Sequence, residues 1–549
     1  MHWSRKIVPV LQLSALAAVS GAQPAHAQNQ PGTQALTSAI NEQPATQSID
    51  PQDSVAVVHD RGGSISNANG TVFVGAVQID GLDKLSPSLF ASVIEKAMGR
   101  EARPEDLVAL AGAIANTART QGYIFASAII LPQTVQAGVL RVQLDEGAVD
   151  EVRISGSDNG RLRSILHHLI SRSAQKDEVE RQLLLAADVP GITITKTRYV
   201  RENGKGVLLV DVREDRARGL LVADNQGPDA SGPVRMRLSY NFNSLLTDGD
   251  VLYVQLLDTV VEPDELAYGF ARYGVILNDD GLQASVYGSL GHTRPGGRLQ
   301  GFDLSGRSWQ VGANASYPLL RSQQSSLWLS ADFALLSVLE SQRSVPILRD
   351  RIATATVGIN GSRRLGDGRL YGGMAIARGF DVLGATRAGD PMASRSDADG
   401  TFTKGYAWFN WLTGITGRLS LRVSGQGQLS FDPLLSAQEI GLGGPYYGRG
   451  YDFSERTGDN GALGLIELRR RFTMSDNRWM QLYVFADGGV VDNLRHGFGS
   501  GSLASTGSGL RAGFGKVEVA VEGALPLSGP RFDSGDRAPK VNFSLGVSF

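Results

Sequence analysis

The chain of 549 residues contains no cysteine, and this absence excludes several classes of protein. Disulfide scaffolds, cysteine-ligated zinc or iron–sulfur centres and thiol nucleophiles all need that residue. Only 7 histidines are present, so we expect neither a metal site nor a cofactor held by histidines. The 53 basic and 55 acidic side chains give a net charge of −2, which leaves no basic excess for binding nucleic acid.

Long apolar runs are also missing. The run Ile7–Val19 is shorter than the ~20 residues that span a bilayer as a helix. Arg5 and Lys6 precede it, and the small-x-small sequence Ala25–Ala27 follows. We therefore predict that residues 1–27 are a signal peptide that is cleaved at that site. Because no later apolar run is long enough, the exported chain is either soluble or a transmembrane β-barrel.

Catalytic motifs are absent from the sequence. It has no Gly-x-Ser-x-Gly elbow, no Gly-x4-Gly-Lys-Ser/Thr phosphate loop and no His-Glu-x-x-His zinc motif. The neighbouring His167 and His168 would face different sides of a helix, so we expect a surface or packing role for them. The sequence therefore predicts a protein that is not an enzyme.

The region after the signal peptide divides into a polar linker and two small modules. The linker, residues 28–70, is rich in Gln, Asn, Pro, Thr and Ser, and a short helix is possible within it at 37–42. Residues 71–147 show the order strand, helix, helix, strand, strand, with Ser86-Pro87 as the start of the first helix. The same order repeats over residues 148–216. A three-stranded sheet of this kind leaves a strand edge at which another chain can add by backbone pairing.

Residues 217–549 have a different pattern, in which apolar and polar side chains alternate with a period of two. The end of the chain shows this alternation, with apolar residues at positions Val541, Phe543, Leu545, Val547 and Phe549. In an outer-membrane barrel the apolar face meets lipid and the polar face lines a lumen, whereas a soluble sandwich would turn its polar face outward. Longer polar stretches such as 384–400 suit extracellular loops.

The segments with this alternation are ~9–12 residues long, which lets a tilted strand cross a bilayer. We count about 16 of them, an even number as in bacterial barrels of this type. The sequence thus predicts α+β modules (two repeats) followed by an all-β transmembrane barrel of about 16 antiparallel strands. The terminal Phe549 is the expected C-terminal signature for the barrel assembly machinery.

Several short sequences resemble a known family, the outer-membrane transporters of two-partner secretion of the haemolysin and filamentous-haemagglutinin secretion/activation type. This family belongs to the superfamily in which polypeptide-transport-associated (POTRA) repeats precede a β-barrel. The resemblance extends over roughly residues 71–549 and rests on these sequences: Gly122-Tyr123, Leu131-Pro132, Gly138-Val139-Leu140, Glu146-Gly147, Val189-Pro190-Gly191-Ile192, Pro433-Leu434-Leu435, Glu439, Gly443-Gly444, Arg449-Gly450-Tyr451, Glu467-Leu468-Arg469 and Tyr483 to Gly489.

The resemblance implies a site inside the barrel. Arg449, Gly450 and Tyr451 would form the tip of a long inward-folded loop that also contains Gly443 and Gly444. The implied acidic partner of the arginine is Asp487, and Glu467 lies on the strand between them in the sequence. Tyr483, Phe485 and Gly488 would belong to the strand that supports the loop.

The position of Asp487 leaves two arrangements open when only the alternation is considered. Asp487 shares a face with Tyr483 and Phe485, so either this face points into the lumen or Asp487 lies beyond the bilayer. The resemblance favours the first arrangement, with Val484 and Ala486 toward lipid. If the site is dry, removing one member of an Arg449–Asp487 pair should cost ~3–5 kcal/mol.

The function implied is secretion of a protein. The repeats would capture an unfolded exoprotein in the periplasm by strand addition, and the barrel in the outer-membrane lipid would pass it to the cell surface. Two alternatives remain, namely a factor that assembles other outer-membrane barrels and a passive porin with periplasmic binding modules. We expect the location to be the outer membrane, with the repeats in the periplasm.

Overall fold

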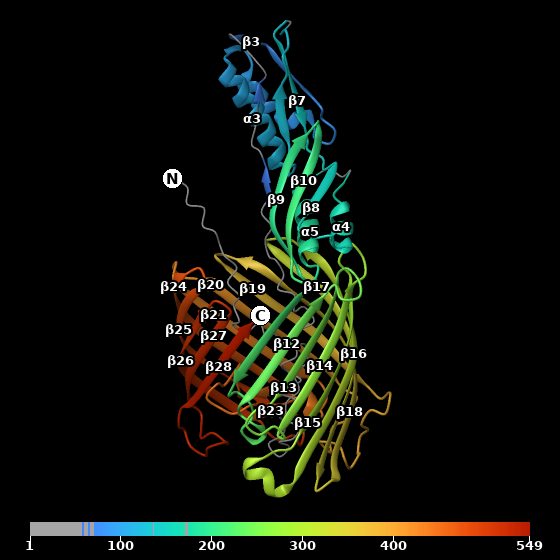
Figure 1. The fold of residues 1–549 in the computed structure, drawn as a ribbon, viewed down its shortest axis with the longest axis vertical. Coiled ribbons are helices and arrows are strands. Elements are labelled where there is room, and N and C mark those ends of the chain that lie inside the picture. Colours follow the sequence, from blue (N-terminus) through green and yellow to red (C-terminus); the bar gives the residue numbers. More distant parts are fainter. Residues whose placement is uncertain (1–56, 60–63, 66–70, 136, 171–173) are drawn as a thin grey trace.

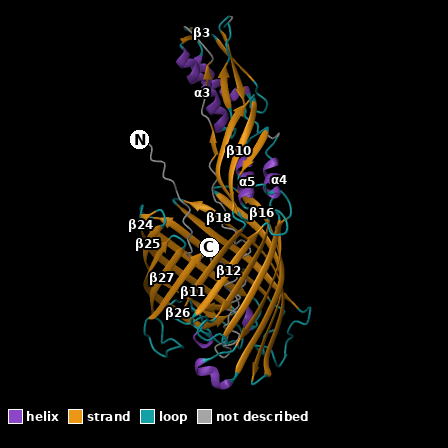
Figure 2. Ribbon diagram, viewed as in Figure 1, coloured by secondary structure: helices purple, strands orange, loops and turns teal. Residues whose placement is uncertain are grey.

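The computed structural model describes residues 57–59, 64–65, 71–135, 137–170 and 174–549. The predicted signal peptide and the possible helix at 37–42 lie outside the described residues. The described chain forms two α/β repeats that follow one another beyond one end of a β-barrel (Figure 1). None of the described helices is both long enough and apolar enough to cross a membrane. Figure 2 shows the longer helices within the repeats, whereas the barrel wall consists of strands.

The first repeat packs its helices against a small sheet. Its elements are β3 (Val72–Val74), β4 (Ala76–Asp80), η1 (Pro87–Phe90), α2 (Ala91–Ala97), β5 (Arg100–Ala102), α3 (Pro104–Thr120), β6 (Ser127–Ile130) and β7 (Val139–Asp145). Pro87 and Pro104 stand at the first helical positions, where the missing N–H costs no hydrogen bond. Leu107 and Ile114 of α3 are buried against Leu140 and Val142 of β7 in one apolar cluster. The helix spacing of apolar residues thus builds this core.

The described part of the second repeat shares the order strand, helix, helix, strand, strand with the first, without counterparts of β3 and β5. Its elements are β8 (Glu151–Ser155), α4 (Gly160–His167), α5 (Lys176–Ala187), β9 (Ile192–Glu202) and β10 (Lys205–Glu214). Asn159 caps α4, because its side chain accepts a hydrogen bond from the N–H of Leu162 at 3.1 Å. Ile165 and Leu166 are completely buried and pack with Val210 of β10.

Two short strands from the linker change the sheets of both repeats. β1 (Val57–His59) pairs in parallel with β9, and β2 (Ser64–Ile65) pairs in parallel with β6. The sheet orders are therefore β2-β6-β7-β4 and β1-β9-β10-β8. The sheets thus have four strands rather than the expected three, because the chain itself pairs with the edges of β6 and β9, whereas β4 and β8 stand at the opposite edges. Residues 57–59 and 64–65 of the predicted linker therefore take part in the sheets.

Residues 217–549, all of which the structure describes, form a closed barrel of 16 strands. The strands are β11 (Ala217–Asp224), β12 (Arg235–Asn243), β13 (Asp250–Asp258), β14 (Leu266–Ile276), β15 (Gln283–Thr293), β16 (Leu304–Arg321), β17 (Ser325–Gln342), β18 (Val345–Leu365), β19 (Gly368–Phe380), β20 (Thr403–Gly414), β21 (Leu419–Ser430), β24 (Asn460–Ser475), β25 (Arg478–Asp492), β26 (Gly501–Phe514), β27 (Val517–Pro526) and β28 (Lys540–Ser548). Each strand pairs antiparallel with its neighbours, and β11 pairs with β28 to close the ring. This confirms the predicted fold class.

The two faces of the barrel wall carry the residues that the alternation predicts. Outward-facing Leu290 is 71% exposed and Ile376 is 65% exposed, whereas inward-facing Glu467 is completely buried. Phe549 follows the last strand and is held by two backbone hydrogen bonds with Gly219. Its ring lies 6.0 Å from that of Tyr240 and is half exposed on the outer face. The barrel is thus apolar outside and polar inside.

Polar contacts fix the second repeat to the near rim of the barrel. Arg321 of β16 forms two hydrogen bonds with the carboxylate of Asp188, at 2.6 and 2.8 Å, and both side chains are buried. In the turn between β14 and β15, Asp279 accepts a hydrogen bond from Ser164 at 2.7 Å and lies 3.2 Å from His168. His168 therefore contributes to the contact between the second repeat and the barrel.

Candidate functional site

The loop between β21 and β24, residues 431–459, folds back inside the barrel, and we call it the finger. Its stem is the antiparallel pair β22 (Ile440–Leu442) and β23 (Arg456–Gly458). At its tip, Arg449 is 5% exposed and Tyr451 is completely buried. The finger therefore occupies part of the lumen rather than projecting from the far rim (Figure 1).

Glycines let the tip of the finger turn sharply and approach the wall. Gly443, Gly444 and Gly448 have φ values of +117°, +99° and +78°, which side-chain-bearing residues rarely adopt. A Cβ atom at Gly450 would lie 2.9 Å from the backbone nitrogen of Pro526, at the end of β27. The backbone N–H of Gly448 also donates to Asp487 Oδ1 at 3.1 Å.

Arg449 forms ion pairs with three carboxylates of the barrel wall. Its Nη2 donates to Glu467 Oε2 at 3.0 Å and its Nε to Asp487 Oδ2 at 2.9 Å. Its Nη1 donates to Glu522 Oε2 at 2.6 Å. One guanidinium thus links the finger to β24, β25 and β27. Such charge-assisted hydrogen bonds are stronger than those between neutral groups.

Further cations and a hydroxyl complete this network. Glu467 Oε1 accepts from Arg469 Nε at 2.5 Å and from Arg511 Nη1 at 2.9 Å. Ser505 donates its hydroxyl to Asp487. The positive charges of Arg449, Arg469 and Arg511 face the carboxylates across buried positions, so the charges are compensated inside the protein.

Aromatic rings of β25 form the surface on which the arginines lie. The guanidinium carbon of Arg449 is 3.8 Å from the ring centre of Phe485, and that of Arg511 is 3.8 Å from the ring centre of Tyr483. The Tyr483 hydroxyl donates to Glu522 Oε2 at 2.9 Å. Tyr483, Phe485 and Asp487 point inward, which selects the first of the two arrangements left open by the alternation.

Gly488, which was expected to support the finger, instead lies close to the neighbouring strand β26. A Cβ atom there would lie 2.2 Å from the carbonyl oxygen of Leu503 on the neighbouring strand β26. The structure thus places Gly488 at a close approach between strands, and brings the other residues singled out on β25 to the finger.

Tyr451 anchors the tip by packing and by hydrogen bonds. Its hydroxyl accepts from the backbone N–H of Ser528 at 2.8 Å and of Gly529 at 3.2 Å. Its ring belongs to an apolar cluster of the finger stem and the wall, whose other buried members are Ile440, Leu442, Leu463, Val491 and Leu503. The tip therefore has an ionic and an apolar attachment.

Sequence reasoning missed Glu522, Arg511 and Ser505, all of which belong to the network. A signal for Glu522 exists in the sequence, because it falls on the polar side of the alternating segment that became β27. The pairing itself joins residues 73 positions apart, and no local pattern encodes it.

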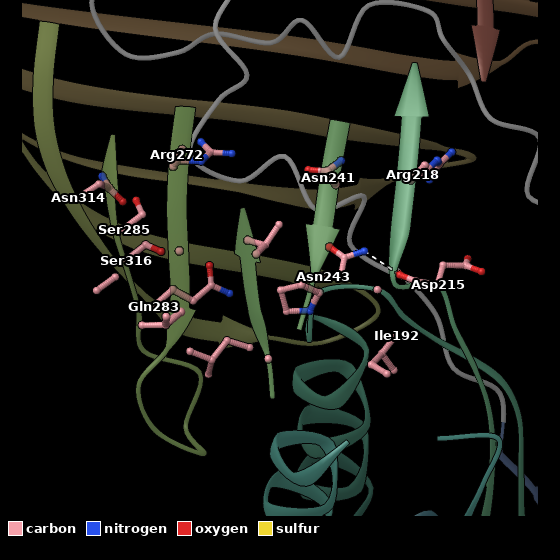
Figure 3. A pocket seen from close by; sticks show the side chains of 18 of the residues that line it. Ile192, Asp215, Arg218, Asn241, Asn243, Arg272, Gln283, Ser285, Asn314 and Ser316 are labelled. Carbon is pink, nitrogen blue, oxygen red and sulfur yellow. Dashed lines mark hydrogen bonds between the residues drawn. The ribbon is translucent and has the colours of Figure 1, made fainter. Parts of the chain in front are cut away.

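A polar cavity of about 190 Å³ lies at the barrel mouth beneath the second repeat (Figure 3). Gln283, Ser285, Asn314 and Ser316 of β15 and β16 line one side of it, and Asn241 and Asn243 of β12 lie nearer the other. Ile192, the first residue of β9, and Arg218 of β11 line the other side. The cavity therefore connects the sheet of the second repeat with the lumen wall.

A 16-stranded barrel with α/β repeats at one rim and a charged finger inside defines an outer-membrane transporter of the POTRA–barrel class. The sequence model of the haemolysin secretion/activation proteins ShlB/FhaC/HecB matches residues 204–512, more than half of the chain. The chain belongs to this family of two-partner secretion transporters. A model of the ShlB-type POTRA domain matches residues 72–147.

Curated relatives and solved structures agree with this assignment. The chain is 24% identical over 490 residues to the heme/hemopexin transporter protein HuxB of Haemophilus influenzae strain 86-028NP, with 83% of each chain covered. CdiB from Escherichia coli has a similar fold, with a TM-score of 0.70, 19% identity and coverage of 88% of this chain and 91% of CdiB. CdiB from Acinetobacter baumannii has a TM-score of 0.62 at 17% identity, with 95% and 98% covered.

Proposed function

We propose that this protein binds an unfolded exoprotein in the periplasm and passes it through the barrel to the cell surface. The observation that carries the proposal is the finger inside the lumen, fixed by Arg449 to three carboxylates, within a barrel of a secretion-transporter family. The absence of sequence motifs for ATP hydrolysis fits transport that is driven by folding of the exoprotein outside the cell.

The periplasmic part of the route starts at the strand edges of the repeats. β1 occupies the edge of β9, with Val57 opposite Thr197, and β2 occupies the edge of β6. An extended exoprotein segment would replace these short strands, because backbone pairing demands little of the side-chain sequence. Ile192 begins β9 and lines the mouth cavity, so a strand that runs along β9 leads to the lumen.

The mouth cavity suits an extended polypeptide. Carboxamides such as Asn241 and Gln283 offer both donors and acceptors to passing peptide groups (Figure 3). Within the lumen the finger would set the resting conformation. For the membrane step, we assign the half-exposed Phe549 to recognition by the barrel assembly machinery and the outward apolar face to contact with lipid.

The test is co-expression with the product of the neighbouring large open reading frame in a Gram-negative host that lacks both genes. We expect the exoprotein in the medium only when the transporter is present. Arg449→Ala and Asp487→Ala should lower its amount, since each leaves buried charge uncompensated. The matched control is Arg387→Ala, which removes an exposed arginine paired with Asp381.

Three results would contradict the proposal. If both variants secrete normally, the finger does not control secretion. If the exoprotein stays in the cell while the amounts of other outer-membrane barrels depend on this protein, its role is barrel assembly. Passage of small solutes alone, without exoprotein in the medium, would indicate a porin.

A further inference from the structure

The base of the finger carries a second charged cluster, separate from the one at the tip. We call this base, residues 434–439 together with Asp459, the neck. Glu439 directly precedes β22, and Asp459 directly follows β23. Arg395, from the loop between β19 and β20, donates through Nη1 to Glu439 Oε1 at 2.9 Å and to both Asp459 oxygens at 2.9 and 3.0 Å. One guanidinium therefore joins the residues that flank the β22–β23 stem of the finger.

The charged groups of this cluster are shielded from water. Glu439 and Asp459 are completely buried, and Arg395 is 6% exposed. Asp397 keeps the guanidinium oriented, because its two oxygens accept from Nε and Nη2 of Arg395 at 3.2 Å. Asp459 also accepts backbone N–H groups from Leu434 and, on the next loop, Leu494, at 2.8 Å each.

A lysine reinforces the same neck. Lys404 of β20 is completely buried, and its Nζ donates to the backbone oxygen of Gln438 at 2.7 Å. The side chain of Gln428 donates to that oxygen and to the backbone oxygen of Asp459, both at 3.1 Å. The neck is thus held from β20 and β21 as well as from Arg395.

Apolar packing extends the neck across the lumen. Leu434, Leu435 and Ala437 of the finger share one buried cluster with Phe402 and with inward residues of the opposite wall. Those wall residues are Tyr253, Leu257, Leu266, Tyr268, Phe270, Leu336, Val338 and Ile352. The neck therefore fills the far side of the lumen between two walls.

The two clusters attach the finger to different parts of the barrel. The tip is bound through Arg449 to strands β24, β25 and β27. The neck is bound through Arg395 to a loop, residues 381–402, which is itself fixed to β18 where the N–H of Ser394 donates to Asp350 at 3.0 Å. Among the residues that the structure describes, none forms ion pairs in both clusters, so each attachment can break without the other.

We propose that Arg395 is a second latch, a positioning residue that holds the neck independently of the tip, and that the finger leaves the lumen only when both latches open. This inference deepens the proposed function, because it assigns part of the gating to a residue outside the tip network. Replacing Arg395 would leave Glu439 and Asp459 buried without the guanidinium that bonds to both, which favours the open neck.

The absence of native cysteine allows a direct test by thiol labelling. Ser454, near the tip, is 3% exposed, so Ser454→Cys places a single thiol that reacts with a soluble maleimide only when the finger moves. In the detergent-solubilised full chain, Arg395→Ala should accelerate labelling about tenfold or more, because it leaves a buried carboxylate pair uncompensated. The exposed Arg387→Ala, in the same loop, should leave the rate unchanged.

The double variant Arg395→Ala/Arg449→Ala decides whether the latches are independent. For independent sites the two accelerations multiply, since their free energies add. If the double variant labels no faster than Arg449→Ala alone, Arg395 acts only through the tip and the proposal is wrong. Equal rates for Arg395→Ala and Arg387→Ala would also overturn it.

Rescue by a conservative change separates positioning from general loss of folding. Arg395→Lys keeps the charge but loses the bonds that Nε and Nη2 make with Asp397, so we expect an intermediate labelling rate. Migration of the unheated sample on a denaturing gel shows whether the barrel is folded. If Arg395→Ala does not fold, Glu439→Gln, which removes one of the two finger carboxylates that Arg395 holds, must also accelerate labelling. The test needs no exoprotein, so a failure of the proposed secretion would not affect it.

Discussion

The repeats and the barrel use apolar residues in opposite ways. In the second repeat, Leu162, Ile165 and Leu166 are completely buried among helices and strands. In the barrel, large apolar side chains such as Leu290 and Ile376 lie on the outside, and the inside contains Glu467 and Arg449. The repeats thus have an apolar core like that of a soluble protein. The barrel instead has an apolar outer belt and charged groups inside.

This difference shows what each interior requires of its sequence. An apolar core needs only side chains of suitable size, because dispersion and the hydrophobic effect are not directional. A charged interior needs a partner for every charge, since an isolated buried charge is very costly. Glu467 accordingly has three arginines around it, Arg449, Arg469 and Arg511.

The largest loss of stability is expected when Glu467, the carboxylate that pairs with three arginines, is replaced. Glu467→Gln should lower the free energy of unfolding by about 3–5 kcal/mol, because three arginines then face one another. The temperature at which the detergent-solubilised barrel loses its compact form on an unboiled gel measures this. A variant as stable as the parent would show that water enters the site and screens the charges.

The next effect tests the apolar core of the repeat. Leu166→Ala should destabilise the second repeat by about 2–5 kcal/mol, since the side chain is completely buried. Hydrogen exchange should rise in α4 and β10 while the barrel strands keep their protection. Leu131→Ala, at a half-exposed position, is the control and should change exchange little. Equal exchange in the two variants would contradict a tightly packed repeat.

A pair of adjacent substitutions tests the two faces of the barrel wall. Val357 is 56% exposed on the outer face of β18, and Thr356 faces inward opposite Asp332. Val357→Arg should reduce folding into lipid vesicles by about 2–4 kcal/mol, as for arginine near the bilayer centre. Thr356→Arg should be tolerated better, because Asp332 can pair with it. The reverse order would mean that the assigned faces are exchanged.

The smallest effect is expected at an exposed ion pair of the repeats. Arg153 contacts Glu151 at 2.6 Å and Glu202 at 2.7 Å, but all three side chains are about half exposed. Arg153→Ala should leave the melting temperature of the chain unchanged within error, because water screens such pairs. A clear loss of stability would show that this surface is covered by something in solution.

The sequence predicts the elements well where periodicity is strong. The helices α3 and α5 and the alternating strands of the barrel occur where the apolar spacing places them. The strand β6 is short, because Ile124 and Phe125 lie in a turn and only residues 127–129 pair with β7. The two short strands at 57–59 and 64–65 were not predicted, since the polar linker gave no sign that these residues would pair with β9 and β6.

The site is predictable to a smaller extent. The resemblance singled out Arg449, Asp487 and Glu467, which the structure brings within hydrogen-bond distance. It did not reveal Glu522 or the neck residue Arg395. Their partners lie 73 and 64 positions away in the chain, so only the closed ring brings them together.

The sequence by itself determined the class of fold, because a period of two with apolar residues on one side fixes which face of every strand meets lipid. It also determined the two repeats, through the helical spacing of their apolar residues. Only the tertiary structure decided which charges meet inside the lumen and which strand edges are covered. Such contacts depend on barrel closure and on the path of the finger, and neither is encoded in any local stretch of residues.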